Sequence, residues 1–531
     1  MPYLGVAPNP RENREVDDIS SSFNGSTTAF TLQSGGSNVS PGSDTAIIVS
    51  LGGVVQNPGT DYTIAASTIT FTTAPASGLS FFGVVLAQSI DIETPADGTV
   101  TPAKIVSGQD FTFNSVSIGK GANSVTGNTV LGESALDASV TGDDNTAIGK
   151  EALTTLTSGA RNTAVGANSL DALTTANNCT GVGHDALTNM TTGANNTAFG
   201  SFAGAGITTA AQCVAIGKGT LNTTTTGDNN TAVGQNVMAS NTSGSQNTAV
   251  GSLSLDANTT GSNNVALGYS SLTTNTTGTN NLAVGAFSLD ANTTADNNTA
   301  IGFGALGANT TGAGNTALGK DSLNVNTTAN YNTGVGHHSL IANTTGTQNA
   351  AFGAFSLDAN TTANDNSGFG YGTLSSNTTG TGNTAIGKEA LNQNTTANYN
   401  TGLGHHSMIL NTTGTQNTAV GSFSLDANTT ADNNSALGYG ALSSNTTGTA
   451  NTAVGREALN QNTTASNNTA VGKDALILNT TGADNTAIGA FALDANTTAS
   501  NNTAIGIQAL TTNTTGTENT AVGHDALADN T

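Results

Sequence analysis

Charged residues are scarce in this sequence. They make up 8% of its 531 residues, whereas a typical soluble domain is about 25% charged. Lysine and arginine together number only 11, and the formal net charge is −23. Binding to nucleic acid or to an anionic membrane depends on clustered basic residues. We therefore expect neither a nucleic-acid partner nor insertion into a membrane.

Large side chains and cysteines are also few. Tryptophan is absent, aromatic residues make up 4% of the chain, and there are two cysteines. Two cysteines do not make a disulfide framework. No apolar run approaches the ~18–20 residues of a membrane-spanning helix, and the polar opening "MPYLGVAPNPRENREVDD" lacks the pattern of a secretory signal. Such a composition suits either disorder or a repeat fold with a thin core.

The sequence does contain a strict internal repeat. A phrase of small and apolar residues ends in glycine every 17 residues from Gly132 to Gly523, in 23 steps without insertion or deletion. We call this residue the repeat glycine and count positions from it. Position −1 is Val, Ile, Leu or Phe in all 24 coils, position −2 is mostly Ala, and position +4 is Leu in 21 coils. Self-similarity at one fixed period predicts a solenoid.

Each repeat has a simple structural interpretation. Thr-Ala-Val-Gly predicts a short strand whose side chains alternate between two faces. We expect the large residue at position −1 to face the core, alanine to face a closely packed neighbour, and the leucine at +4 to supply a second core residue. Glycine permits a turn or close backbone approach, and "NTTG" is typical of a corner. The return segment is compatible with a strand or with a single helical turn.

Asparagine occupies two fixed positions. It fills position −4 in 22 of 24 coils and position +7 in all 18 coils from Asn241 on. Coils stacked ~4.8 Å apart would align these amides in hydrogen-bonded ladders. The alternative, glycosylation of the "NTT" phrases, lacks support from a secretory signal. The earlier coils carry other residues at +7, namely Ser139, Leu156, Leu173, Met190, Ile207 and Thr224.

The two cysteines are the exceptions at position −4. Cys179 and Cys213 lie 34 residues, or two coils, apart. Two strand spacings are about 9–10 Å, which exceeds the ~7 Å over which two Cα atoms can be bridged. We therefore expect small buried thiols and no disulfide between them within one chain.

Positions +1 and +2 vary most. They hold Lys150, Lys218 and Arg456, among other cations. They also hold phenylalanines, for which we expect packing between chains, with an adhesive exposed surface as the alternative: Phe202, Phe287, Phe355, Phe423 and Phe491. They also hold all six histidines: His184, His337, His338, His405, His406 and His524. We expect an exposed, variable position there, and a metal site shared between chains is the alternative. No pattern indicates catalytic, cofactor-binding or metal-binding residues, so we expect no enzyme and no cofactor.

The chain divides into three parts. Residues 1–95 do not repeat, and their short apolar runs separated by turns predict a small antiparallel β-sandwich. We expect the first 20 residues to be an extended tail that threads into another protein. Residues 96–128 are a connector ending in the first stalk strand, and residues 129–531 are the all-β stalk. Two large apolar side chains are a small core for 17 ordered residues, so we expect three chains to share it.

The motifs resemble those of a known family. The "NTAVGxxALxxNTTG" array resembles the stalk repeats of phage tail fibres, marine cyanophages in particular. "VSLGGVVQNPGTDYTI" resembles their virion-proximal domain, and "DGTVTPAKI" is similar to their connector. The resemblance implies a homotrimer in the virion tail. Its N-terminal region would bind a tail adaptor or tail tube protein, and its distal end would reach a host receptor, directly or through a distal protein. Many such fibres end in a chaperone or receptor-binding domain, whereas this sequence stops inside a repeat at "HDALADNT". Three alternatives follow for a distal domain: it is cleaved off, it is a separate protein, or it is absent.

Other functions remain as alternatives. A tailspike that degrades host polysaccharide needs paired carboxylates in a groove, and the uniform 17-residue coil does not favour it. A cellular trimeric adhesin is suggested because "NTAVG" is similar to the β-roll repeats of trimeric autotransporter adhesins. An ice-binding solenoid is suggested by the regular threonines.

Overall fold

The protein consists of strands and turns. The computed structural model describes residues 13–86, 110–223 and 226–530. The chain divides into two compact units, Met1–Ser107 and Gly108–Thr531. Within the described ranges the only helical segments are short 3-10 turns, and no helix there is long and apolar enough to cross a bilayer. The predicted all-β class is confirmed. Residues 1–12 of the predicted tail and residues 96–109 of the predicted connector lie outside the described residues.

The first unit contains antiparallel sheets. A four-stranded sheet has the order β1 (Arg14–Val16), β9 (Phe81–Val85), β5 (Ile47–Leu51) and β6 (Val54–Val55). A three-stranded sheet has the order β2 (Ala29–Thr31), β8 (Thr68–Phe71) and β7 (Tyr62–Ala65), and β3 (Gln33–Ser34) pairs with β4 (Ser37–Asn38). Two 3-10 turns, η1 (Ser20–Ser22) and η2 (Asp44–Ala46), connect these strands.

Alternate residues of both larger sheets form one core. Phe30 and Phe71 of the three-stranded sheet and Phe81 of the four-stranded sheet are buried in the same cluster. Phe23 makes edge-to-face contacts with all three rings, a favoured geometry for aromatic pairs. The hydroxyl of buried Tyr62 lies 2.8 Å from the carbonyl oxygen of Ile47, which satisfies its one polar group.

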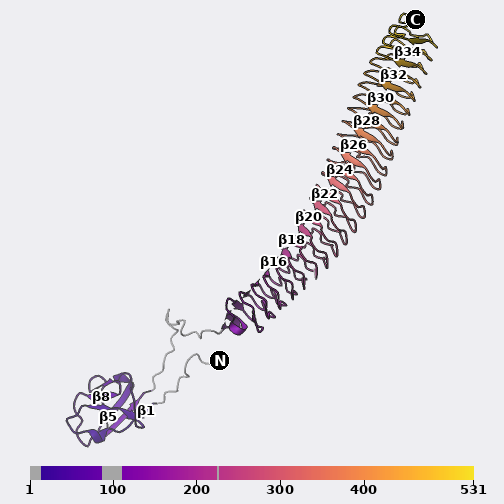
Figure 1. The fold of residues 1–531 in the computed structure, drawn as a ribbon. Coiled ribbons are helices and arrows are strands. Elements are labelled where there is room, and N and C mark those ends of the chain that lie inside the picture. The colour runs from indigo at the N-terminus through magenta and orange to yellow at the C-terminus, as the bar shows by residue number, and fades with distance from the viewer. Residues whose placement is uncertain (1–12, 87–109, 224–225, 531) are drawn as a thin grey trace. The chain divides into compact units, whose positions relative to one another are not determined.

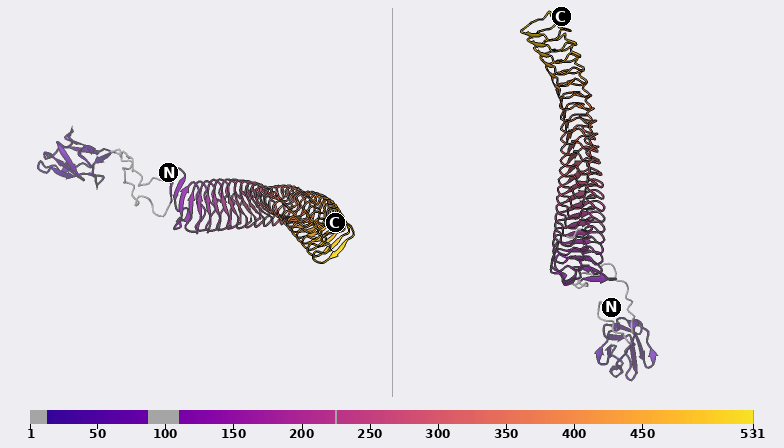
Figure 2. Two further views of the ribbon diagram at one scale, coloured as in Figure 1. Left: turned by 90° about the horizontal axis from the view of Figure 1, so that it is seen from above. Right: turned by 90° about the vertical axis from the view of Figure 1, so that its right-hand side faces the viewer.

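The second unit is a β-solenoid. It opens with the antiparallel hairpin β10 (Phe111–Phe113) and β11 (Val116–Gly119), followed by the 3-10 turn η4 (Ala122–Ser124). From β12 (Thr129–Gly132) through β13 (Thr146–Ile148) to β35 (Thr520–Val522), each coil contributes one parallel strand 17 residues after the last. These strands lie one above another along one side of a curved rod (Figures 1 and 2). About 23 turns separate the first from the last, as the repeat predicts.

The phase of the strands differs from our expectation. In β13 to β35 the central Ala or Gly is buried, as is Val130 in β12, and the large residue at position −1 points outward. In β29 (Thr418–Val420), Ala419 is fully buried and Val420 is partly exposed. The prediction that position −1 faces the core is therefore wrong. The interior is already filled by the leucine at +4 and by asparagine side chains. Close packing leaves room there for a methyl group only.

The return segment is neither a strand nor a helical turn. It is a series of turns in which positions +2 and +4 have positive φ: Phe423 has φ 57° and the buried Leu425 has φ 53°. Left-handed backbone is costly for a leucine, and bonds between coils hold it: the Leu425 N–H donates to the Ala441 carbonyl at 2.9 Å. A side chain on Gly421 (φ 133°) would meet the backbone of Gly438 at 2.4 Å, which explains the repeat glycine.

The asparagines at position −4 form the first asparagine ladder. The Asn400 amide oxygen accepts the backbone N–H of Asn417 at 2.9 Å, and Asn417 Nδ2 donates to the Ala431 carbonyl at 2.7 Å. Both residues are fully buried. Each side chain therefore joins its own coil to the next, which confirms the predicted ladder.

The "NTT" corner contains two further ladders. In the second asparagine ladder, at position +7, Asn462 Nδ2 donates to Asn445 Oδ1 at 2.8 Å and to the Ala465 carbonyl at 3.0 Å. The threonine hydroxyl at +8 donates to the backbone carbonyl of the equivalent threonine in the next coil. The Thr446 hydroxyl, for example, donates to the Thr463 carbonyl at 3.0 Å. Because the corner asparagines are buried with their amides engaged, these positions do not suit glycosylation in the folded protein.

The cysteines replace members of the first ladder. Both are buried and free, so the predicted absence of a disulfide between them is confirmed. Cys179 Sγ lies 3.4 Å from the Gly193 carbonyl and Cys213 Sγ lies 3.4 Å from the Gly227 carbonyl, where asparagine would place its amide nitrogen. Sulfur is a weaker donor than an amide nitrogen, so these two coils carry a weaker link.

Replacement of one ladder residue tests this account. We expect Asn462→Ala to destabilise its coil by about 2 kcal/mol, because buried amides on both sides lose partners. The matched control is Gln461→Ala, which removes an exposed side chain next to it. Hydrogen exchange of the backbone amides in residues 445–479 should accelerate in the first variant only. Equal exchange in the two variants would contradict a stabilising role for the amide ladder.

The cysteines provide a second test. Burial raises the pKa of both thiols, so we expect neither to react with a thiol reagent in the folded protein and both to react after unfolding. Cys179→Asn should raise stability by about 1 kcal/mol, because the ladder regains an amide donor and acceptor. Thiol titration and urea unfolding at fixed protein concentration measure the two effects. Reaction of either thiol in the folded state would show that the coil opens there.

Candidate functional site

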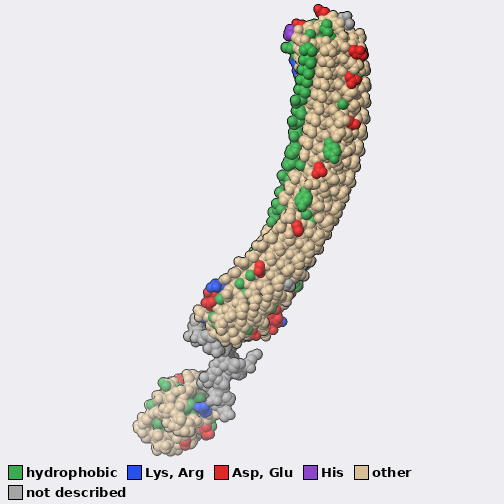
Figure 3. Space-filling view, turned by 45° about the vertical axis from the view of Figure 1, so that its right-hand side comes forward, with side chains coloured by type: hydrophobic (Ala, Val, Ile, Leu, Met, Phe, Trp, Pro, Cys, Tyr) green, Lys and Arg blue, Asp and Glu red, His purple; other side chains and the backbone are tan. Residues whose placement is uncertain are grey.

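An apolar column runs along the solenoid. We give this name to the residues at position −1 from Leu131 to Val522, one per strand. None of them is buried; for example, Val250 is 39% exposed and Leu437 is 50% exposed. Phe352 and Phe369 stack with their ring centroids 4.8 Å apart. Figure 3 shows hydrophobic side chains gathered in a band along the rod.

The face that carries this column has no charge. The 24 strands from β12 to β35 contain no charged residue, and the outward residue at position −3 is mostly threonine. Charged residues of the coils lie at other positions, chiefly +1, +2, +5 and +12. Contiguous exposed apolar patches of more than a few hundred Å² mark interaction surfaces. This face of the sheet is therefore the first candidate for a functional surface.

A second face follows the corner after the repeat glycine. The six histidines lie there, and none of them is buried. His184 pairs with Asp185 at 3.0 Å, and His406 Nε2 lies 2.8 Å from Glu389 Oε2. His405 stacks on His406 with centroids 3.7 Å apart. Among the described residues, no group of three or more His, Cys, Asp or Glu side chains is placed to hold a metal ion.

Aromatic rings accompany the histidines on this second face. Phe355 contacts His337, His338 and Tyr371 edge to face, and Phe423 contacts His405, His406 and Tyr439 in the same way. The two sets are 68 residues apart, or four coils. Within one chain these phenylalanines therefore pack against neighbouring coils, while the expected packing between chains stays a prediction.

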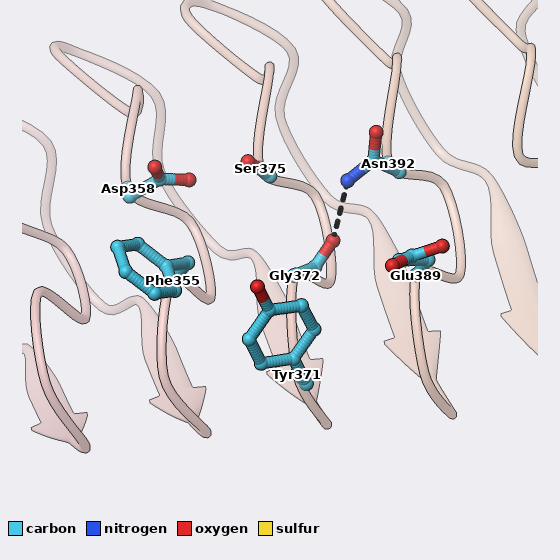
Figure 4. A pocket seen from close by; sticks show the side chains of 7 residues that line it. All are labelled: Phe355, Asp358, Tyr371, Gly372, Ser375, Glu389 and Asn392. Atoms are coloured by element: carbon cyan, nitrogen blue, oxygen red, sulfur yellow. Dashed lines mark hydrogen bonds between the residues drawn. The ribbon is translucent and has the colours of Figure 1, made fainter.

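Two equivalent hollows lie next to these aromatic sets. The first hollow has a volume of about 440 Å³, and its lining is Phe355, Asp358, Tyr371, Gly372, Ser375, Glu389 and Asn392. The second has a volume of about 480 Å³, and its lining is Phe423, Asp426, Tyr439, Gly440, Ser443, Glu457 and Asn460. Figure 4 shows the residues of the first hollow on three successive coils, in a row at position +2 and a row at position +5 with Tyr371 beside them.

Each hollow contains polar groups held in place. Asn392 Nδ2 donates to the Gly372 carbonyl at 2.9 Å (Figure 4), and Asn460 bonds to Gly440 in the same way at 2.9 Å. Asp358 Oδ1 is buried and has no hydrogen-bond partner among the described residues. An unpaired buried acceptor is costly, and it marks a place where a donor from a ligand would be favourable.

Sequence reasoning did not predict the hollows. Phe355 and Asn392 are two coils apart, and only the stacking brings them together. The available signal was the recurrence of Phe355, Asp358 and Tyr371 as Phe423, Asp426 and Tyr439. Each hollow also holds two carboxylates, the residue type that glycosidases use in pairs.

Comparison of the chain with models of known protein families, with curated proteins and with solved structures yields no match. The function is therefore inferred from the faces and hollows of the solenoid.

The acidic residues at position +5 predict a pH dependence. Burial raises the pKa of Asp256 and Asp290 above the ordinary value of 3.8. The folded state then binds more protons than the unfolded state between that value and the raised pKa, so stability falls as the pH rises through this window. We expect the unfolding midpoint in urea to be higher at pH 4 than at pH 7.

A pair of variants isolates this effect. Asp256→Asn with Asp290→Asn should gain less stability between pH 7 and pH 4 than the original protein. The comparison variant, Asp365→Asn with Asp484→Asn, removes the same charge from exposed corners and so separates the effect of burial from that of net charge. Protein concentration is held fixed, because association shifts the midpoint. Parallel profiles for both double variants would contradict the assignment.

Proposed function

We propose that the protein is a structural fibre, similar to a phage tail fibre, in which three copies of the chain associate through the apolar column. The observation that carries the proposal is the column itself, which continues through all 24 strands on a face without charge. Fully parallel sheets occur almost only where both faces are covered. In one chain the coil interior covers one face, and the other face carries the column.

The size and spacing of the column favour another copy of the same chain as the cover. One copy offers 24 large apolar residues, comparable with the ~20–30 residues per side of a stable interface. A second copy has the same 17-residue spacing, so every level meets its equivalent. Copies that run in the same direction around a shared axis form a closed cyclic assembly. The resemblance of the stalk repeats to tail fibres supports three copies.

The proposal assigns the ends of the fibre different roles. We infer that the N-terminal unit is a β-sandwich that attaches to a tail adaptor or tail tube protein. The exposed Val54 and Val55 on the edge strand β6 fit a role in contact with a partner, because apolar edge strands invite pairing. The solenoid then extends toward the host surface for adsorption.

Crosslinking tests the shared face directly. Under mild oxidation, Val454→Cys should give covalent dimers on a denaturing gel, because equivalent residues of different copies meet at each level. One thiol per trimer stays unpaired, so dimers and monomers are both expected. The control is Gln461→Cys, an exposed position in the same coil but off the strand face, which should give no specific crosslink.

Native mass measurement of the unmodified protein completes the test. A mass of three chains is expected. A mass of two chains would keep the shared face but reject threefold symmetry. A single-chain mass, with no crosslink through Val454→Cys, would overturn the fibre proposal.

A further inference from the structure

We propose that the two hollows are binding sites for a neutral glycan. This inference deepens the proposed function, because it gives the stalk a ligand class of its own at the host surface. The biological role of the hollows rests on the proposed function. The binding itself requires only the residues of the solenoid. The first hollow is lined by Phe355, Tyr371, Asp358 and Glu389, among others, and the second by Phe423, Tyr439, Asp426 and Glu457.

The aromatic rings match the apolar side of a sugar ring. Tyr371 is 52% exposed and Tyr439 is 55% exposed, and each makes an edge-to-face contact with the phenylalanine of its hollow, with centroids 5.8 Å and 6.0 Å apart. The face of an aromatic ring carries partial negative charge, which attracts the C–H groups on one side of a pyranose. These contacts with the phenylalanines hold the tyrosines in place before a ligand arrives.

The polar groups match the hydroxyl edge of a sugar. Asp358 presents a buried carboxylate oxygen without a partner, and carboxylates accept hydrogen bonds from hydroxyl groups. His406 holds Glu389 at 2.8 Å in the first hollow, and Arg456 holds Glu457 at 2.9 Å in the second. In the second hollow Asp426 Oδ1 accepts a hydrogen bond from Ser443 Oγ at 2.6 Å. Each hollow therefore combines a ring surface with two oriented carboxylates and an amide, a set that suits a polyhydroxylated ligand.

The charge of the hollows selects against other ligands. Lys388 lies 3.5 Å from Glu389 and Arg456 lies 2.9 Å from Glu457. Asp358 and Asp426 are the lining carboxylates without such an ion pair among the described residues, and they disfavour phosphate, sulfate and acidic sugars through repulsion. Among the described residues no group of three or more acidic, histidine or cysteine side chains is placed for a metal ion. A neutral glycan avoids the repulsion and uses both carboxylates as acceptors.

The hollows also remain accessible in the proposed fibre. Their residues occupy positions +2 and +5, with the tyrosines at +1, whereas the apolar column occupies position −1 on the strand face. The two hollows are four coils apart, about 19 Å along the stack. A polysaccharide that reaches both gains effective concentration for the second contact. Weak single sites thus give useful binding on a repetitive surface.

Affinity electrophoresis of the full chain tests the inference. The native gels contain neutral polysaccharides (dextran, mannan or galactomannan) or acidic ones (alginate or hyaluronan). We expect at least one neutral polymer to retard the protein. Tyr371→Ala with Tyr439→Ala should weaken retardation at least tenfold. The control is Tyr331→Ala with Tyr399→Ala, which removes two tyrosines of similar spacing that are 68% and 65% exposed outside the hollows; it should migrate like the original protein.

A second double variant and a native mass make the outcome decisive. Asp358→Asn with Asp426→Asn keeps the side-chain size and should also weaken retardation. No retardation by any neutral polymer, retardation by acidic polymers alone, or equal loss in the control variant would overturn the glycan assignment. An altered native mass of the Tyr371 and Tyr439 variant would overturn it too, because the tyrosines would then belong to a chain interface. Loss of retardation in this variant with an unchanged trimer mass supports the glycan assignment. If the original protein is retarded by a neutral polymer but has the mass of one chain, only the fibre proposal is rejected.

Discussion

The stacking of buried asparagine amides is the interaction on which the rest of the structure depends. A side-chain amide has both a donor and an acceptor. One asparagine at a fixed position in each coil can therefore have its hydrogen-bonding groups paired with its own and neighbouring coils of the stack. Asn400 and Asn417 show this for the first ladder, and Asn445 and Asn462 for the second. A single inserted residue would move one coil's amides out of line and leave buried polar groups unpaired, at about 1–3 kcal/mol each. The uninterrupted 17-residue spacing follows from that constraint.

The ladders also decide what lies outside. In most coils amides and one leucine fill the interior, so from β13 on the strand contributes only alanine or glycine to it. The large residue of each strand then has no place inside and projects from the opposite face of the sheet. The thin core and the exposed apolar column are thus two results of one packing arrangement. A chain built in this way exposes apolar surface on every coil, and it is this surface that we propose as the interface between copies.

Much of this fold was predictable because it depends on the same residue type recurring at a fixed spacing. The period, one strand per coil, the amide ladders and the separate cysteines all follow from residues that recur every 17 positions. The phase of the strands was not predictable, since Ala419 and Val420 are both apolar and alternation alone does not say which points inward. The left-handed backbone of Leu425 was missed because leucine has no intrinsic preference for it; bonds to the next coil impose it. The hollows were missed because their residues come from three coils.

The same stacking that hides residues inside the coil also fixes those outside it. Phe355 lies on left-handed backbone with φ 57°, and its N–H donates to the His337 carbonyl of the preceding coil at 3.0 Å. Phe423, four coils later, has the same φ and a bond of 3.0 Å to His405. Side chains on such a backbone keep their direction and their distance from one another. Duplication of four coils therefore repeats a whole surface in register, and the variable positions acquire a periodic display without any change in the interior.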